Sequence, residues 1–110
     1  MPRNEIGMQL DRNGYCGSLL FGHDAHWCYL CGRHCRTERH EIFGGANRQK
    51  SKELGLWVHL CEECHRTGER AVHRNGEVSR SLKQKAQAIA QEFYHWPVEV
   101  FRAKFGKSYL

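Results

Sequence analysis

Apolar residues recur in the C-terminal part of the chain at alternating steps of four and three positions. They are Leu82, Ala86, Ile89, Phe93 and Trp96. This spacing places the side chains on one helical face, so the chain from Ser79 onward is predicted to form an amphipathic helix. Ser81 and Gln84 are candidates for a capping box at its start, and Pro97 is expected to end it or to open the next helix.

A second, shorter apolar stripe follows this helix. Val98, Phe101 and Phe105 are spaced as on a helix, and Gly106 is placed to close it. Stripes of this kind are most often core, so both helices are expected to pack against the rest of one domain. In an alternative interpretation, Phe93, Trp96, Phe101 and Phe105 form an exposed surface for a protein partner.

Shorter patterns predict strands earlier in the chain. Residues 38–43 and 56–60 have the length and composition of short strands, and the second is bounded by Gly55 and Cys61. The polar, basic segment between them favours one helical turn before Gly55. Residues 1–26 are glycine-rich and irregular, with one candidate strand at 18–21. The predicted fold class is therefore α+β.

Length and composition limit the domain organisation. A chain of 110 residues with 40% hydrophobic and 26% charged residues fits one globular domain. We divide it into an irregular lead-in (1–26), a central segment that concentrates cysteine and histidine (27–76) and a helical segment packed on the same domain (77–110). A chain this short buries only about two-thirds of its unfolded surface, so an added staple is expected.

Cysteine content and charge indicate the compartment and the partner class. No apolar run is long enough to cross a membrane and no hydrophobic signal region is visible, which predicts a cytoplasmic protein without membrane contact. There the six cysteines are expected to bind metal rather than to form disulfides. A net charge of +5 favours an anionic partner, and no obligate protein partner is indicated.

Four cysteines form two Cys-x-x-Cys pairs. Cys28 and Cys31 make the first pair, and Cys61 and Cys64 make the second. Two residues between thiols allow a tight turn to aim both sulfur atoms at one ion, and two such turns complete a tetrahedral zinc site. We predict a structural Zn²⁺ that contributes on the order of 10 kcal/mol to folding.

The two remaining cysteines have no comparable pattern. Cys16 and Cys35 have His23, His26 and His34 near them in sequence, but the spacings are irregular. They are expected to be ordinary thiols rather than a second cysteine site.

The chain between and after the cysteine pairs carries a family resemblance. Its motifs are HEIFGGANR at 40–48, GLWVHLC at 55–61, VHRN at 72–75 and FGKSYL at 105–110. In this order they resemble the HNH nucleases in their zinc-stapled form, in particular small phage and prophage HNH-like proteins. The resemblance implies a ββα-metal (treble-clef-like) core, in which two strands and a helix surround one catalytic divalent cation. It also implies a DNA endonuclease, encoded by a phage and active in the host cytoplasm.

The resemblance assigns roles to particular residues. His40 would be the general base that deprotonates the attacking water. His65 and His73 would bind the catalytic cation, which could be Mg²⁺, Mn²⁺, Ni²⁺ or Zn²⁺. Asn75 would supply an orienting amide.

The sequence departs from the family pattern in two ways. The acidic residue of the first strand, Glu41, follows His40 instead of preceding it. In a shifted register His40 would be a metal ligand and Glu41 the base, and both assignments stay open. The position of the usual middle asparagine holds Leu56, so Asn47 and Asn75 are the available substitutes.

Basic residues accompany these candidates. The predicted nucleic-acid-binding residues are Arg39, Arg48, Lys50, Arg66 and Arg74. A nuclease must neutralise phosphates to bind, so we expect DNA as the partner, with RNA as an alternative. Phosphate contacts carry no sequence information, and no base-reading module is evident, which predicts weak or structure-directed specificity.

A function from another class is also compatible with the pattern. Leu56 at the asparagine position, and Glu41 beside His40, favour a non-catalytic zinc-binding module that binds nucleic acid. Such a module would bind DNA in a salt-dependent manner and would not need His40.

Overall fold

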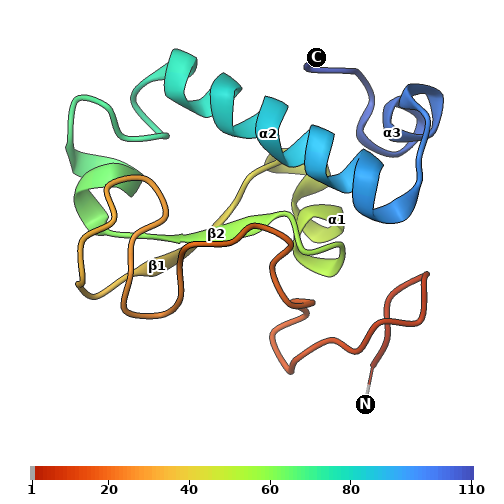
Figure 1. Cartoon of the computed structure of the whole chain (residues 1–110), viewed down its shortest axis with the longest axis horizontal. Coiled ribbons are helices and arrows are strands. Elements are labelled where there is room, and N and C mark those ends of the chain that lie inside the picture. The colour runs from red at the N-terminus through yellow and green to blue at the C-terminus, as the bar shows by residue number, and fades with distance from the viewer. Residues whose placement is uncertain (1) are drawn as a thin grey trace.

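The computed structural model describes residues 2–110 and has a small α+β fold, as predicted. Strands β1 (Glu38–Glu41) and β2 (Trp57–Leu60) form a two-stranded antiparallel sheet, in which Glu38 lies opposite Leu60 and Glu41 opposite Trp57. Helix α2 (Gly76–Tyr94) runs along one side of the sheet, α1 (Arg48–Glu53) lies at one end of the strands, and α3 (Val98–Phe105) lies beyond the C-terminal end of α2 (Figure 1). The two predicted strands are confirmed, each slightly shorter than expected.

A compact connection joins the two strands. It contains a 3₁₀ turn (Gly45–Asn47) and α1 (Arg48–Glu53), which confirms the helical turn expected before Gly55. Gly55 has a φ of 77°, and a Cβ there would lie 2.5 Å from the carbonyl oxygen of Gly17. Glycine is therefore required where the lead-in passes close to the start of β2.

The sheet has two different faces because successive strand residues point to opposite sides. His40 lies opposite Val58 on one face, and both side chains are buried. Arg39 and Glu41 lie on the other face, opposite His59 and Trp57. Neighbouring residues of β1 therefore reach different surroundings.

Helix α2 (Gly76–Tyr94) begins earlier than its apolar stripe suggests. The Asn75 side chain caps it by accepting hydrogen bonds from the backbone N–H groups of Glu77 and Val78, both at 3.1 Å. The predicted capping box of Ser81 and Gln84 is therefore wrong, since both residues lie inside the helix. An asparagine with extended backbone just before these free N–H groups satisfies the same need for acceptors.

The buried face of α2 also differs in part from the predicted stripe. Its buried residues are Leu82, Ala86, Gln87 and Ala90. Phe93 is 53% exposed, whereas Gln87 is fully buried. The burial of Gln87 follows from its hydrogen bonds to the C-terminal segment, which no apolar pattern can reveal.

Helix α3 (Val98–Phe105) follows the predicted pattern closely. Pro97 is its N-cap, and Gly106 ends it with a φ of 91°. Phe101 and Phe105 are buried and pack against Phe43, with ring centroids 5.6 and 4.9 Å from it. This aromatic group joins the loop after β1 to α3 and forms part of the core.

The lead-in is irregular, and the candidate strand at 18–21 is wrong. Leu19 donates its backbone N–H to the carbonyl of Gly55 at 2.8 Å, and the Ser18 hydroxyl donates to the carbonyl of Trp57 at 2.6 Å. These single contacts replace a strand ladder, and Leu19 and Leu20 are buried in the core. Among the described residues, no helix is long and apolar enough to span a membrane.

Candidate metal centres

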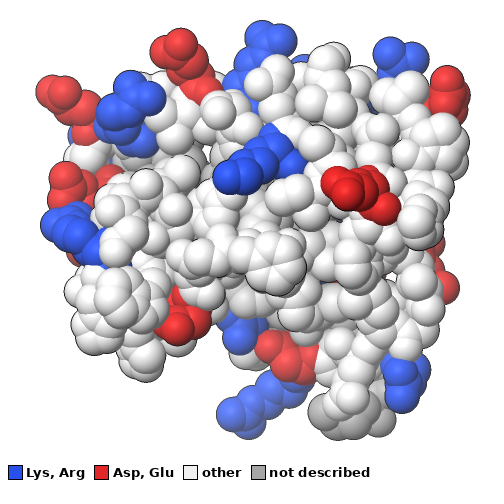
Figure 2. Space-filling model, viewed as in Figure 1, with Lys and Arg blue, Asp and Glu red and all other residues white. Residues whose placement is uncertain are grey.

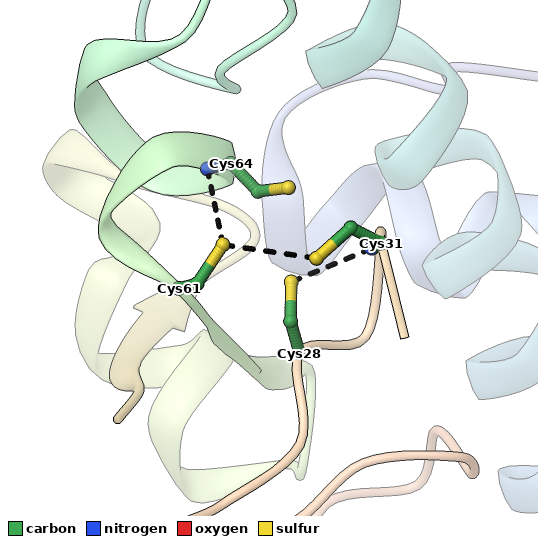
Figure 3. A group of neighbouring side chains, drawn as sticks. All are labelled: Cys28, Cys31, Cys61 and Cys64. Carbon is green, nitrogen blue, oxygen red and sulfur yellow. Dashed lines mark hydrogen bonds between the residues drawn. The ribbon is translucent and has the colours of Figure 1, made fainter. Parts of the chain in front are cut away.

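Four cysteines from two distant segments meet at one point. Cys28 and Cys31 lie in the loop before β1, and Cys61 and Cys64 follow β2. Their sulfur atoms all lie within 4.8 Å of one another, and the Sγ atoms of Cys31 and Cys61 are 3.8 Å apart. Figure 3 shows the four side chains directed toward a common centre. The cluster is positioned to hold a metal ion, as the two Cys-x-x-Cys pairs predict.

Each pair forms a tight turn that directs backbone donors toward sulfur. The N–H of Cys31 points to Sγ of Cys28 at 3.5 Å, and the N–H of Cys64 points to Sγ of Cys61 at 3.4 Å. Gly32, with a φ of 72°, allows the first turn to close. N–H donors aimed at sulfur favour the thiolate form, which is the form that binds metal.

Arg33 places a positive charge beside the same sulfur atoms. Its guanidinium donates to Sγ of Cys31 at 3.4 Å and to Sγ of Cys61 at 3.5 Å. Burial raises the pKa of Cys31, but these hydrogen bonds outweigh burial and bring its pKa to about 6. Burial raises the pKa of Cys64. Soft thiolate donors in a group of four are compatible with a structural zinc ion.

Cys16 and Cys35 do not belong to this cluster. Cys16 is buried beside Met8, and the Cys35 thiol donates to the carbonyl of Arg33 at 3.4 Å. Within residues 2–110, neither residue belongs to a group that could hold a metal ion.

Three histidines form a second cluster. His40 comes from β1, His65 from a π-helical segment (Glu63–Thr67), and His73 from the loop before α2. Their candidate ligand atoms all lie within 4.8 Å of one another. His40 and His65 are buried, and His73 is exposed. The three predicted histidines therefore meet at one place, with one side open to solvent.

Glu38 orients the central histidine. Its Oε1 lies 2.8 Å from Nδ1 of His65 and also accepts a hydrogen bond from Nε of Arg66 at 3.3 Å. A carboxylate at Nδ1 holds the proton there and leaves Nε2 of His65 to bind. That Nε2 lies 2.9 Å from Nε2 of His73. Metal-binding histidines commonly have such a carboxylate partner.

Sequence reasoning missed Glu38, although a signal was present. Glu38 and His40 are two residues apart on one strand, so alternation places them on the same face. The acidic residue that the sequence singled out was Glu41, which lies next to His40 in the chain. Because side chains alternate along a strand, Glu38, two residues from His40, reaches the cluster, whereas the neighbouring Glu41 does not.

The environment keeps His40 neutral. Burial lowers its pKa to about 3, and the charges of His65 and His73 act in the same direction. Burial, followed by the charge of His65, also lowers the pKa of His73. Neutral imidazoles with free ring nitrogens can bind a cation or accept a proton.

The structure does not bring Glu41 to this cluster. Glu41 lies on the opposite face of the sheet, where it accepts hydrogen bonds from the Tyr15 hydroxyl and from Nε of Arg48, both at 2.6 Å. One residue along a strand reverses the direction of the side chain, so His40 and Glu41 cannot both face the cluster.

The candidate asparagines have structural contacts. Asn75 caps α2, and the Asn47 amide donates to the carbonyl of Phe105 at 2.9 Å. Leu56 is fully buried in the core. Neither amide is among the groups that meet at the histidines, so the predicted catalytic role of Asn75 has no support from its contacts.

The five predicted nucleic-acid-binding residues are dispersed over the molecule. Arg39 pairs with Asp11 at 3.0 Å and Arg48 pairs with Glu41, both on the sheet face away from His40. The Lys50 ammonium donates to the carbonyl of Lys104 in α3. Arg66 and Arg74 lie next to His65 and His73 in the chain, where they contact Glu38 and the carbonyl of Thr67.

No broad basic surface takes the place of these residues on the face that Figure 2 shows. Lysine and arginine are interspersed there with aspartate and glutamate around a largely uncharged centre.

Comparisons of the chain with protein-family models, with curated proteins and with solved structures found no match. The function of the chain therefore has to be inferred from the geometry of the two clusters.

Proposed function

We propose that this protein is a metal-dependent endonuclease of the HNH type that hydrolyses phosphodiester bonds in DNA. The observation that carries the proposal is the convergence of His40, His65 and His73 next to a four-cysteine cluster. The order of β1, β2 and the π-helical segment around these histidines, with α1 between the strands, is compatible with the strand–strand–helix order of a ββα-metal core. A phage origin and action in the host cytoplasm belong to the same proposal.

His65 and His73 are the proposed ligands of the catalytic cation, since their Nε2 atoms lie only 2.9 Å apart. A bound divalent cation would neutralise the scissile phosphate and stabilise the leaving oxygen. Glu38 holds the Nδ1 proton of His65 and so keeps Nε2 available. Solvent reaches the cluster on the side of His73, which is exposed.

His40 is the proposed general base. Its ring centroid lies 5.1 Å from that of His65 and 5.2 Å from that of His73, so it can face a water molecule held between them. Burial keeps its imidazole neutral at physiological pH, so that a ring nitrogen can face this water with a free lone pair.

The cysteine cluster positions these groups through the backbone. His65 follows Cys64 directly, and its N–H donates to the carbonyl of Cys61 at 2.9 Å. Val72 donates to the carbonyl of Cys64 at 2.9 Å, which brings the His73 loop alongside. A structural zinc ion at the cysteines would therefore hold both ligand-bearing segments in place.

Plasmid cleavage tests the proposal. The purified protein is expected to nick or linearise supercoiled DNA when Mg²⁺, Mn²⁺, Ni²⁺ or Zn²⁺ is added, and His40→Ala is expected to abolish this while keeping the fold and the cysteine-bound zinc. His26→Ala is the matched control, because His26 is exposed and lies outside both clusters. Absence of cleavage by the wild-type protein with all four cations would contradict the enzyme proposal.

A non-catalytic zinc module that binds nucleic acid is the second candidate. The buried Leu56 at the expected asparagine position favours it, as do the side-chain hydrogen bonds of Asn75 and Asn47, which go to backbone groups of α2, Glu69 and Phe105. It predicts DNA binding that is unchanged by His40→Ala. Of the four aromatic residues proposed as a docking surface, Phe101 and Phe105 are buried and Phe93 is 53% exposed, so the four do not form one exposed surface.

A further inference from the structure

A surface depression of about 350 Å³ lies between α2 and the C-terminal segment. Ser79, Arg80 and Lys83 line it from α2, and Lys107, Ser108 and Tyr109 line it from the C-terminal segment. Three cationic side chains, two hydroxyl groups and one aromatic ring therefore share this cavity, and no carboxylate lines it.

The cations of this depression lack the carboxylate partners that four arginines of the central segment have. Arg33, Arg39, Arg48 and Arg66 each pair with a carboxylate within 4.0 Å. Arg80, Lys83 and Lys107 have no such partner among residues 2–110. The ammonium groups of Lys83 and Lys107 lie over the Tyr109 ring, 5.5 and 4.8 Å from its centroid. An anionic ligand would therefore meet little competition from neighbouring acids.

The C-terminal wall of the depression is held firmly. The buried Gln87 amide donates to the Ser108 hydroxyl at 2.9 Å and accepts from the backbone N–H of Tyr109 at 2.7 Å. Gln84 donates to the carbonyl of Tyr109 at 2.9 Å. The Tyr109 ring packs against the Phe43 ring, with the two ring centroids 5.3 Å apart. These contacts explain why a glutamine is buried in α2, and they preorganise the cavity before any ligand arrives.

The depression borders the segment that carries His73. It includes Gly76, which opens α2 shortly after His73 in the chain. Figure 1 shows the C-terminal segment returning toward α2, on the far side of that helix from the lead-in.

We propose that this depression binds a phosphate group and holds the backbone of a nucleic acid next to the histidine cluster. Ammonium, guanidinium and hydroxyl donors are the groups that bind backbone phosphates. Phosphate binding in the depression does not require the protein to be a nuclease. Only the further statement that the bound strand is a substrate rests on the proposed function.

Binding of a short fluorescein-labelled DNA, followed by anisotropy at several salt concentrations without added divalent cation, tests this assignment. Lys83→Gln and Lys107→Gln are each expected to weaken binding regardless of sequence. Each should also reduce the slope of log K against log salt by about 0.9 for duplex or about 0.7 for single-stranded DNA. Lys85→Gln is the matched control, because it removes the same charge from α2 outside the depression.

Two outcomes would overturn the phosphate site. Equal losses for Lys83→Gln, Lys107→Gln and Lys85→Gln would show only general electrostatic attraction between the protein and DNA. Inorganic phosphate that shifts the NMR signals of Ser79 and Ser108, together with unchanged DNA affinity in both depression variants, would indicate a site for free phosphate instead of a nucleic-acid backbone.

The same experiments distinguish failure of this site from failure of the enzyme proposal. A wild-type protein that cleaves no DNA but binds it through Lys83 and Lys107 supports the phosphate site and refutes the nuclease. A wild-type protein that cleaves DNA, with both variants binding and cleaving normally, refutes the phosphate site alone.

Discussion

The cysteine cluster and the histidine cluster adjoin in the fold but differ in what surrounds them. Backbone N–H groups and Arg33 face the cysteine sulfurs, and the cluster supplies four donors. The histidine cluster brings three imidazoles together, one of them oriented by Glu38, and opens to solvent at His73. Four protein ligands complete a tetrahedral site, whereas the two proposed ligands His65 and His73 leave positions for water or substrate.

One short segment serves both clusters. Cys61, Cys64 and His65 lie close together in the chain, so the segment that contributes to the closed cluster also positions the open one. The two clusters are therefore joined through the backbone, but the cysteine side chains would stabilise the fold and the histidine side chains would take part in catalysis. Substitutions in the two clusters should have separable effects.

The largest expected effect follows from loss of the cysteine cluster. Cys61→Ser is expected to release zinc and unfold the domain, because binding at such a site contributes on the order of 10 kcal/mol to folding. Zinc content and thermal unfolding by circular dichroism measure this. Cys35→Ser, outside the cluster, should keep both the zinc and the folded state; equal unfolding of the two variants would refute the distinction.

Loss of a proposed ligand in the open cluster should leave the fold intact. We expect wild-type protein to bind two metal ions per chain, and His65→Ala to bind one and to lose cleavage. Titration with Co²⁺ separates the sites, because only the cysteine site gives thiolate charge-transfer absorption. Retention of two ions by His65→Ala would show that the histidines do not form a metal site.

Replacing the orienting carboxylate should have an intermediate effect. Glu38→Gln is expected to reduce metal affinity or cleavage about 10- to 100-fold, the usual loss when the partner of a metal-binding histidine is removed. Glu41→Gln on the other face of β1 should leave cleavage nearly unchanged. A larger loss of cleavage in Glu41→Gln than in Glu38→Gln would support Glu41 as the base.

The smallest expected effect concerns Asn75. Asn75→Ala should lower the free energy of unfolding by about 1 kcal/mol through loss of the α2 cap, without loss of cleavage or metal. Urea denaturation measures this change, and Ser81→Ala serves as the comparison, since Ser81 lies within the helix and caps nothing. Abolished cleavage in folded Asn75→Ala would instead assign that residue to catalysis.

Much of the fold could be predicted from local pattern. Both strands, the helical turn before Gly55, and the ends of α3 at Pro97 and Gly106 follow from apolar spacing and from backbone preferences. The start of α2 could not be predicted from its apolar stripe, since Asn75 caps it through side-chain hydrogen bonds. The strand predicted at 18–21 failed because strand pairing needs a partner that local sequence does not specify.

The sequence by itself determined which residues could bind metal, because tight spacing brings each cysteine pair together and strand alternation sets the direction of His40. Only the tertiary structure decided which groups meet. It placed Glu38 beside His65, directed Glu41 away, paired Arg39 and Arg48 with acids and collected Arg80, Lys83 and Lys107 in one cavity. The physical reason is that these contacts join residues far apart in the chain, where the packing of α2 and its neighbours sets distance and charge.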